Sequence, residues 1–298
     1  MSKVWDAIIV GAGPAGASCA VWLRHLGLDP LLLESSDRIG GLAARNPFAD
    51  IWTVTSPGQT GAEVAQQIAG QVQASGLDVW LNTSVLAVSG SYPLFTVQAT
   101  RADQPVQPLQ AKTVVIATGV RPKDLPGFAG QTFEGVIVGP GDEIMSADFQ
   151  GKRVALLGGG DNAFENYAFV KERGANTACI YARTLRAQKQ FVDRVPASDL
   201  VVGASDVDPA ARTVNGQAYD WILVLYGWQA NIGFLGDLSL TRDDRGFVQT
   251  DTVDAQTTVL GVYAIGEVAQ RMHPCVPTAM ADGVVAAKAI EKILTAGQ

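Results

Sequence analysis

Cysteine and histidine are scarce in this sequence, and their scarcity excludes two kinds of site. The 298 residues include only three cysteines, Cys19, Cys179 and Cys275, and two histidines, His25 and His273. The cysteines lie too far apart in sequence to form a C-x-x-C pair, and an odd, sparse count argues against a secreted disulfide framework. Two histidines and three dispersed cysteines do not assemble a metal cluster, so we expect no metal site.

Basic runs and long apolar runs are also missing. The formal net charge is −7, from 22 basic and 29 acidic residues, and no run of Lys or Arg stands out. A nucleic-acid partner would require a basic stripe, so we expect none. The first apolar run, residues 7–10, is cut short by glycines and is too brief for a signal peptide or a membrane span. We therefore expect a cytoplasmic protein with no membrane partner.

Glycine, in contrast, is abundant, with 32 residues, and it organises the start of the chain. The sequence predicts a strand over residues 7–10, a glycine turn over residues 11–16, a helix to about His25 and a strand over residues 30–33 that ends at Glu34. In such a unit the three glycines allow a tight turn, a close approach to a pyrophosphate and helix packing. Glu34 can accept hydrogen bonds from ribose hydroxyls and repels a 2′-phosphate, which favours FAD or NAD over NADP.

A second unit of the same kind is predicted further along the chain. It consists of a strand over residues 153–157, the glycine turn that starts at Gly158, a helix to about Arg173 and a strand over residues 177–182. Gly11 to Glu34 spans 23 residues, and so does Gly158 to Tyr181. By this count Tyr181 corresponds to Glu34, where its ring either stacks on an adenine or flavin ring or lies at the surface.

The remaining segments predict the domain limits. Residues 85–100 alternate like small antiparallel strands, and residues 112–117 form a buried strand that ends in Thr118-Gly119. The proline-rich residues 121–126 indicate a hinge, and a second crossing is predicted near residues 243–246.

The chain resembles the thioredoxin-reductase-like flavoproteins over nearly its whole length. The matching residues are Gly11–Gly16, Glu34, Gly40-Gly41, Ala117–Gly119, Gly261–Glu267 and Asp282-Gly283. The resemblance implies an α/β fold of two Rossmann-like, three-layer ββα dinucleotide-binding domains with small antiparallel strands, the second domain inserted into the first. It implies an FAD-binding domain over residues 1–121 and 244–298, and a second nucleotide-binding domain over residues 122–243.

The same resemblance implies two sets of binding residues. The first, for FAD, is Gly11, Gly13, Pro14, Ala15, Gly16, Glu34, Gly41, Ala117, Thr118, Gly119, Gly266, Glu267, Pro274, Cys275 and Val276. The second, for NAD(P)H or a second FAD, is Gly158, Gly160, Asp161, Asn162, Ala163, Tyr181, Arg183 and Arg186.

Several positions depart from the family pattern. Glu267 replaces the usual Asp that binds the ribityl chain, and Pro274-Cys275 replaces a common Arg-Gln. Cys275 is either a thiol close to the flavin, with its pKa lowered by a helix N-terminus, or a small buried residue without chemistry. His273 either delivers a proton or makes a structural hydrogen bond. The family has a larger basic cluster in the second unit, of which Arg183 and Arg186 remain here. They either clamp a phosphate or form a solvated pair.

The most consequential departure is the missing dithiol. Where the family has C-x-x-C, this chain reads Gly-Pro-Gly-Asp-Glu-Ile over residues 139–144. Disulfide exchange requires an attacking and a resolving thiol, so the sequence excludes a conventional thioredoxin reductase. We predict an FAD-dependent oxidoreductase, most similar to a cyanobacterial branch with a second flavin in the former NADPH site. The alternatives are an NAD(P)H-dependent flavin or ferredoxin reductase and a non-catalytic FAD-binding sensor. A ferredoxin-like or other small redox-protein partner and a homodimer are expected.

Overall fold

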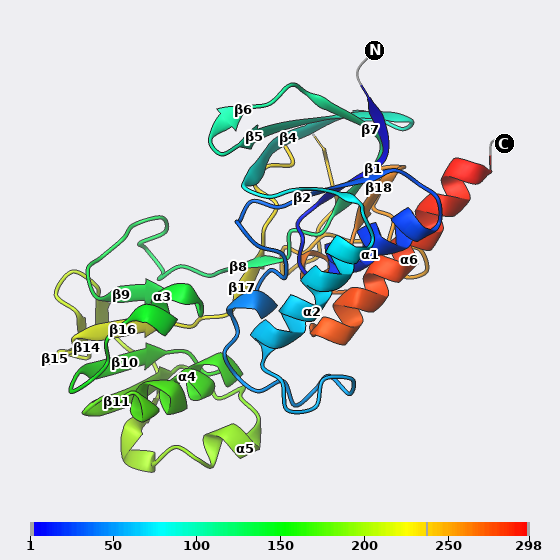
Figure 1. The fold of residues 1–298 in the computed structure, drawn as a ribbon. Coiled ribbons are helices and arrows are strands. Elements are labelled where there is room, and N and C mark those ends of the chain that lie inside the picture. The colour runs from blue at the N-terminus through cyan, green and yellow to red at the C-terminus, as the bar shows by residue number, and fades with distance from the viewer. Residues whose placement is uncertain (1–2, 237, 297–298) are drawn as a thin grey trace. The chain divides into compact units, whose positions relative to one another are not determined.

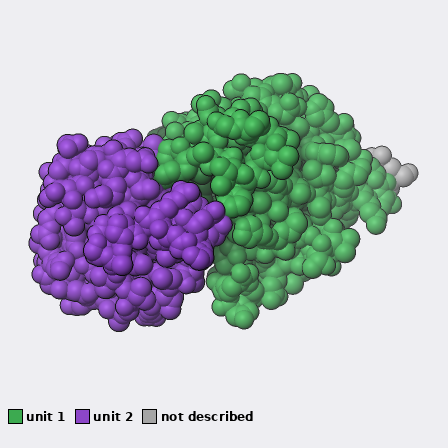
Figure 2. Space-filling view, turned by 90° about the horizontal axis from the view of Figure 1, so that it is seen from below, with its two compact units in different colours: residues 1–120, 229–298 green, residues 121–228 purple. Residues whose placement is uncertain are grey.

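The computed structural model describes residues 3–236 and 238–296, and the chain folds into two compact units. Unit 1 contains residues 1–120 and 229–298, and unit 2 contains residues 121–228 (Figure 2). The second unit is therefore inserted into the first, as the sequence predicted.

Unit 1 is built on a sheet in which parallel strands are extended by antiparallel ones (Figure 1). The strand order is β3-β2-β1-β7-β5-β4, with β18 also paired to β7 and β6 paired to β5. The parallel strands are β3 (Asp78–Trp80), β2 (Pro30–Leu33), β1 (Val4–Val10), β7 (Leu109–Ile116) and β18 (Val262–Ala264). The antiparallel strands are β4 (Thr83–Ser91), β5 (Leu94–Arg101) and β6 (Gln104–Pro105).

Helices cover one face of this sheet (Figure 1). They are α1 (Pro14–His25), α2 (Gly61–Ala74) and α6 (Val276–Thr295), with the short 3₁₀ turns η1 (Ala43–Arg45) and η3 (Gly266–Val268). The helices α1 and α6 touch through backbone at Gly283, where an added Cβ would lie 2.5 Å from the carbonyl oxygen of Ala15. Any larger residue there would push the two helices apart.

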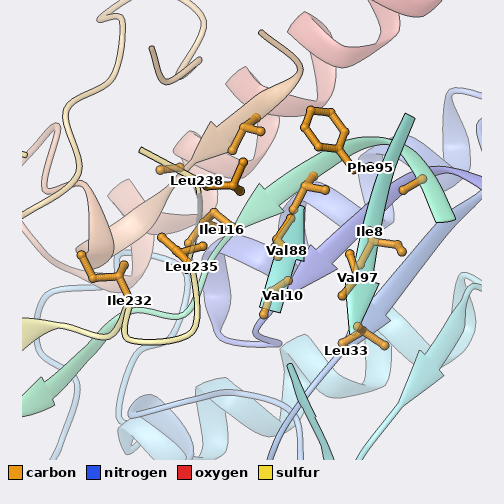
Figure 3. Packing of buried hydrophobic residues seen from close by; sticks show 14 of the residues in the cluster. Ile8, Val10, Leu33, Val88, Phe95, Val97, Ile116, Ile232, Leu235 and Leu238 are labelled. Carbon is orange, nitrogen blue, oxygen red and sulfur yellow. The ribbon is translucent and has the colours of Figure 1, made fainter. Parts of the chain in front are cut away.

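The opposite face of the parallel strands carries a second apolar layer, shown in Figure 3. Ile8 of β1 and Ile116 of β7 are fully buried there, together with side chains of the antiparallel strands. Ile232, Leu235 and Leu238 pack into the same cluster. The return crossing predicted near residues 243–246 is therefore wrong. The chain re-enters unit 1 at residue 229 because these three apolar side chains are buried in its core.

Unit 2 is a smaller unit of the same design. Its parallel sheet has the order β12 (Leu200–Val202), β11 (Thr177–Ala182), β10 (Arg153–Leu157), β16 (Trp221–Val224) and β9 (Val136–Val138). One apolar layer contains the helix α4 (Asp161–Glu172), and the layer on the other face lies under a small antiparallel sheet. The remaining elements are α3 (Asp142–Ser146), α5 (Lys189–Val192), η2 (Ala197–Asp199), β13 (Val207–Asp208), β14 (Thr213–Val214) and β15 (Gln217–Ala218).

The two crossings between the units are paired strands. They are β8 (Val120–Pro122) and β17 (Trp228–Ala230), which form a two-stranded sheet. Within the described part of the chain, no helix is long and apolar enough to cross a membrane.

The close packing of α1 against α6 gives a stability prediction. Gly283→Ala places a methyl group 2.5 Å from the Ala15 oxygen and 2.7 Å from the Cys19 nitrogen. We expect a loss of about 1–3 kcal/mol of unfolding free energy, as for other over-packed cores. Gly70→Ala is the matched control, because Gly70 also lies inside a helix, α2, but has nothing within 4 Å of its added Cβ.

The control variant should gain about 0.5–1 kcal/mol from reduced backbone entropy of the unfolded chain. Urea unfolding followed by circular dichroism measures both changes. Equal effects of the two substitutions would contradict the backbone contact between α1 and α6.

Candidate functional site

The glycine turn after β1 is shaped by two glycines that packing requires. Gly11 has φ +102°, and a Cβ there would lie 2.4 Å from the carbonyl oxygen of Ala117. At Gly16 an added Cβ would lie 2.0 Å from the carbonyl oxygen of Gly11. Both positions therefore admit no side chain, and the turn brings the start of α1 against the end of β7.

Gly13, between them, is different. Its φ of −67° suits any residue, and the nearest protein atom to an added Cβ is the Gly41 Cα at 3.9 Å. Gly13 is also the N-cap of α1, and among the described residues no side chain caps this helix and no acid lies in its first turn. The backbone N–H groups at this helix start are therefore available to an anion. The missing side chain at Gly13 leaves room for a ligand to approach the protein backbone.

Glu34 stands at the end of β2, beside the same turn. Its side chain is buried, with Oε2 accepting a hydrogen bond of 2.8 Å from the Ala12 N–H and Oε1 one of 2.8 Å from the Ser36 N–H. The carboxylate is therefore held rigidly by backbone, and its oxygens retain lone pairs for further donors. It suits vicinal hydroxyls and disfavours a phosphate at this point.

Two further segments border the glycine turn. The N–H of Gly40 donates to the Ala12 carbonyl at 2.9 Å, and a Cβ on Gly41 would lie 3.1 Å from the Gly13 Cα. After β7, the N–H of Ala117 donates to Val10 at 2.9 Å, and the Thr118 hydroxyl donates to the carbonyl of Asn231 at 2.6 Å. Gly119 follows with φ +60° and nothing near its added Cβ. The structure thus gathers all these predicted residues at one edge of the sheet.

The turn η3 completes this edge. Gly266 has φ +72°, and a Cβ there would lie 2.9 Å from the Cβ of Ala15 in the first turn of α1. Glu267 follows directly and is half-buried, and its burial raises the pKa of the carboxyl group. The structure therefore places this acid close to the helix start, where it can accept a hydrogen bond from a hydroxyl group.

Cys275 is the N-cap of α6. Its sulfur accepts a hydrogen bond from the Thr278 N–H and lies 3.3 Å from the Thr278 hydroxyl oxygen. Glu267, Arg271, Cys275 and Thr278 line one small pocket, so the predicted acid and thiol do meet. His273 and Pro274 are exposed in the same loop and Val276 begins the helix, and the His273 carbonyl accepts a 2.6 Å hydrogen bond from Thr278.

In unit 2 the glycine turn repeats the backbone plan. Gly158 would clash with the Leu225 oxygen at 2.3 Å and Gly159 with the Thr184 oxygen at 2.0 Å if either carried a Cβ. Gly160, the N-cap of α4, has no atom within 4 Å of its added Cβ, which matches the openness at Gly13.

The charges around this second turn differ from those in unit 1. Asp161 lies in the first turn of α4 and accepts hydrogen bonds from the N–H and side-chain amide of Gln188, at 2.8 and 3.1 Å. One helical turn further, Glu165 is half-buried, and burial together with the charge of Asp161 raises its pKa to about 6. Glu165 was not among the predicted site residues, although its i, i+4 spacing from Asp161 was a visible signal. Asn162 and buried Ala163 continue the same helix.

Both expectations for Tyr181, that its ring stacks on a ligand ring or that it lies at the surface, are wrong. Its ring is neither at the surface nor free to stack, because it is buried on the sheet and its hydroxyl lies 2.7 Å from that of Tyr219. The register explains the error. Gly11 N–H donates to Leu33 and Gly158 N–H donates to Tyr181, so Tyr181 corresponds to Leu33.

The structural counterpart of Glu34 is consequently Ala182, which has no carboxylate. Arg183 and Arg186 follow it and are exposed, and the Arg186 N–H donates to the Gly159 carbonyl at 2.7 Å. Burial raises the pKa of the half-buried Tyr226, and the nearby charge of Arg183 opposes this shift. Two cations therefore stand beside the second glycine turn, where unit 1 has an acid.

Glu165 gives a pH-dependence prediction. Its folded pKa of about 6 lies above its ordinary value of 4.5, so the folded state binds the proton more tightly and stability falls as pH rises across this interval. Glu165→Gln cannot ionise, so we expect it to be more stable than the natural chain above pH 6. The advantage should vanish towards pH 4.5.

Urea unfolding at both pH values measures the change. Glu172→Gln is the control, because Glu172 is exposed on the same helix. An equal, pH-independent shift in both variants would contradict the role of burial at Glu165.

Comparison with known proteins gives relatives along nearly the whole chain. The chain is 29% identical over 296 residues to the ferredoxin–NADP reductase of Limosilactobacillus fermentum, covering 90% of this chain and 86% of the relative. It is 26% identical to the thioredoxin reductase of Chlamydia trachomatis, covering 96% and 97%.

Solved structures share the fold. The thioredoxin reductase of Lactococcus lactis superposes with a TM-score of 0.81 at 22% identity, covering 98% of this chain and 99% of the other. The bacillithiol disulfide reductase of Bacillus cereus gives a TM-score of 0.82 at 16% identity, covering 98% and 100%.

The model of one family, described as pyridine nucleotide-disulphide oxidoreductase, matches residues 5–197, which is more than half of the sequence. Together with two strand–helix–strand units whose glycine turns lie at the carboxyl ends of parallel strands, this match shows that the chain belongs to the pyridine nucleotide-disulphide oxidoreductase family.

Proposed function

We propose that the chain is an FAD-dependent oxidoreductase that binds FAD in unit 1 and works without a redox-active dithiol. The open space at Gly13 carries this proposal. Packing explains glycine at positions 11 and 16 but not at 13, where only a ligand approaching the backbone requires the absence of a side chain. Glu34 and Glu267 flank this space from two strand ends and fit a ligand with two sets of hydroxyls.

Each residue has a distinct task in this proposal. The N–H groups at the start of α1 hold the pyrophosphate, Glu34 accepts from the adenosine ribose, and Glu267 accepts from the ribityl chain. At the start of α6, Pro277 has no N–H and the Thr278 N–H is bonded to Cys275, so the Val276 N–H is the donor left for the electron-rich edge of the ring system. Bound FAD supplies the electron-transfer chemistry, and the protein orients it and controls access to it.

For unit 2 we propose a pyridine nucleotide that carries a 2′-phosphate. The strand-end position that would hold ribose hydroxyls is Ala182, so nothing there repels a phosphate. Arg183 and Arg186 are exposed beside the turn, and guanidinium groups bind phosphate oxygens in pairs. NADPH is therefore the electron donor best matched to this charge pattern.

A second flavin in unit 2 is the other candidate. Its support from sequence came from the altered basic cluster, the missing dithiol and the ring of Tyr181. Tyr181 no longer contributes, since its ring is buried against Tyr219. Phe164 and Tyr167 are buried in α4, which leaves half-buried Tyr226 and Trp228 as ring partners.

The path by which electrons leave follows from the cysteines. Burial raises the pKa of Cys19 and of Cys179, which makes both thiols unreactive. Cys275 is half-buried in the pocket with Glu267 and is the thiol we propose to face the flavin. Exposed His273, two residues earlier, is the proton donor we propose there. A single thiol cannot complete disulfide exchange, so we propose a small redox protein such as a ferredoxin as the electron acceptor. We also propose that the enzyme is a homodimer, as the resemblance implies.

The first test concerns Gly13. Gly13→Ala should fold normally, because its Cβ meets nothing nearer than 3.9 Å, yet the purified variant should be colourless. The natural chain should be yellow and release about one FAD per chain on denaturation, because only unit 1 binds FAD in this proposal. A ratio near two would favour the second flavin. A variant that keeps its flavin would overturn the FAD site.

The second test concerns the donor. Removing both guanidinium groups, Arg183→Ala with Arg186→Ala, should raise the KM for NADPH roughly 10- to 100-fold, as expected for lost charge-assisted hydrogen bonds. The KM for NADH should stay unchanged, because NADH lacks the 2′-phosphate. Arg194→Ala, also exposed in unit 2, is the control. Anaerobic bleaching of the flavin measures these values, and no bleaching with either nucleotide would favour a non-catalytic sensor.

A further inference from the structure

A buried carboxylate holds the turn that carries Glu267. Asp282 lies in α6 and is 2% exposed, and its Oδ2 accepts a hydrogen bond of 3.0 Å from the Gly266 N–H. Gly266 has φ +72° and immediately precedes Glu267. The position of Glu267 therefore depends on a bond made by its neighbour to α6.

Arg271 locks this carboxylate in place. Its Nη1 donates to Asp282 Oδ1 at 2.8 Å, and its Nη2 donates to the carbonyl oxygen of Thr252. The side chains of Arg271 and Asp282 are only 10% and 3% exposed. One guanidinium thus joins the loop after η3, the helix α6 and the segment at Thr252, all within unit 1.

One donor of this guanidinium has no partner in the protein. Arg271 Nε is buried and, among the described residues, makes no hydrogen bond. Leaving a buried N–H unpaired is unfavourable, so a group that served only the fold would be expected to use it. Arg271 also lines the pocket with Glu267 and Cys275, so the clamp borders the proposed ligand site.

We propose that Arg271, fixed by Asp282, is a positioning residue of the flavin site. It holds the Gly266–Glu267 turn in the conformation that meets the ligand, through the hydrogen bonds of Asp282 to both Arg271 and the Gly266 N–H. This inference rests on the proposed FAD site in unit 1. It adds an arginine that neither the glycine motifs nor the family resemblance indicates.

The test compares FAD binding by three variants. Arg271→Met removes the clamp but leaves Asp282 as a buried charge without its partner, which can prevent folding. The double variant Arg271→Met with Asp282→Asn removes both charges and is expected to fold. Lys112→Met is the control, since Lys112 pairs with Asp6 at 2.7 Å in the same unit but is half exposed.

The readouts are the FAD dissociation constant and the visible absorption band of the bound flavin, both measured below the unfolding temperature. We expect at least tenfold weaker FAD binding and a shifted band in the double variant, and no change in the control. A double variant that binds FAD within twofold of the natural chain, with the same band, refutes the positioning role. One that does not fold assigns the pair to stability alone and equally overturns the proposal.

Different outcomes overturn the proposed FAD site and the positioning role of Arg271. If the natural chain itself takes up no FAD, the proposed function falls and the positioning role falls with it. If the natural chain binds FAD and the clamp variants bind it equally well, only the role of Arg271 is lost.

Discussion

The uncapped start of α1 is the feature around which unit 1 is arranged. A helix end leaves several backbone N–H groups without partners, and at α2 the side chain of Thr60 supplies an acceptor for one of them. At α1 no such side chain stands among the described residues. The parallel order β2-β1-β7-β18 brings the carboxyl ends of four strands to the same edge, so each strand delivers its next residues to this helix start. Glu34, Ala117–Gly119 and Gly266-Glu267 owe their proximity to that order rather than to their sequence separation.

The two units show how one backbone plan accepts opposite charge patterns. Both turns have two sterically required glycines and one open position. In unit 1 the acid lies at the strand end and the helix start is free of charge, whereas in unit 2 the strand ends at Ala182 and an acid, Asp161, lies in the first helical turn. Asp161 is engaged by Gln188, which orients its carboxylate by two hydrogen bonds. The charge pattern at each turn thus depends on a few side chains, while the fold only presents them.

Much of this arrangement was readable from the sequence, for identifiable reasons. The strands β2, β10 and β11 have the predicted limits because each is a short run of buried residues in a unit whose glycines mark the turn and the helix end. The resemblance assigned Glu267 and Cys275 to the same set of binding residues, and in the structure both line one pocket. Tyr181 was misplaced because a residue count is blind to strand register, and one residue of slip turns a side chain to the other face. The clamp of Arg271 on Asp282 joins a loop to a helix, and no spacing rule predicts such a contact. The crossing at residue 229 was missed because Ile232, Leu235 and Leu238 lie in a segment without regular periodicity.

The insertion of unit 2 has a consequence for how the protein matures. During synthesis the whole of unit 2, residues 121–228, emerges before β18 and α6 are made. Domains fold as units while the chain is being produced, so unit 2 can acquire its structure while β7 still lacks β18 as a neighbour and α1 lacks α6. The incomplete first unit then exposes the apolar surface that α6 later covers, and its pocket has neither Glu267 nor Cys275. If unit 1 binds FAD as proposed, loading accordingly comes late, after α6 has docked, and a ribosome-bound chain halted before residue 262 still exposes this apolar surface.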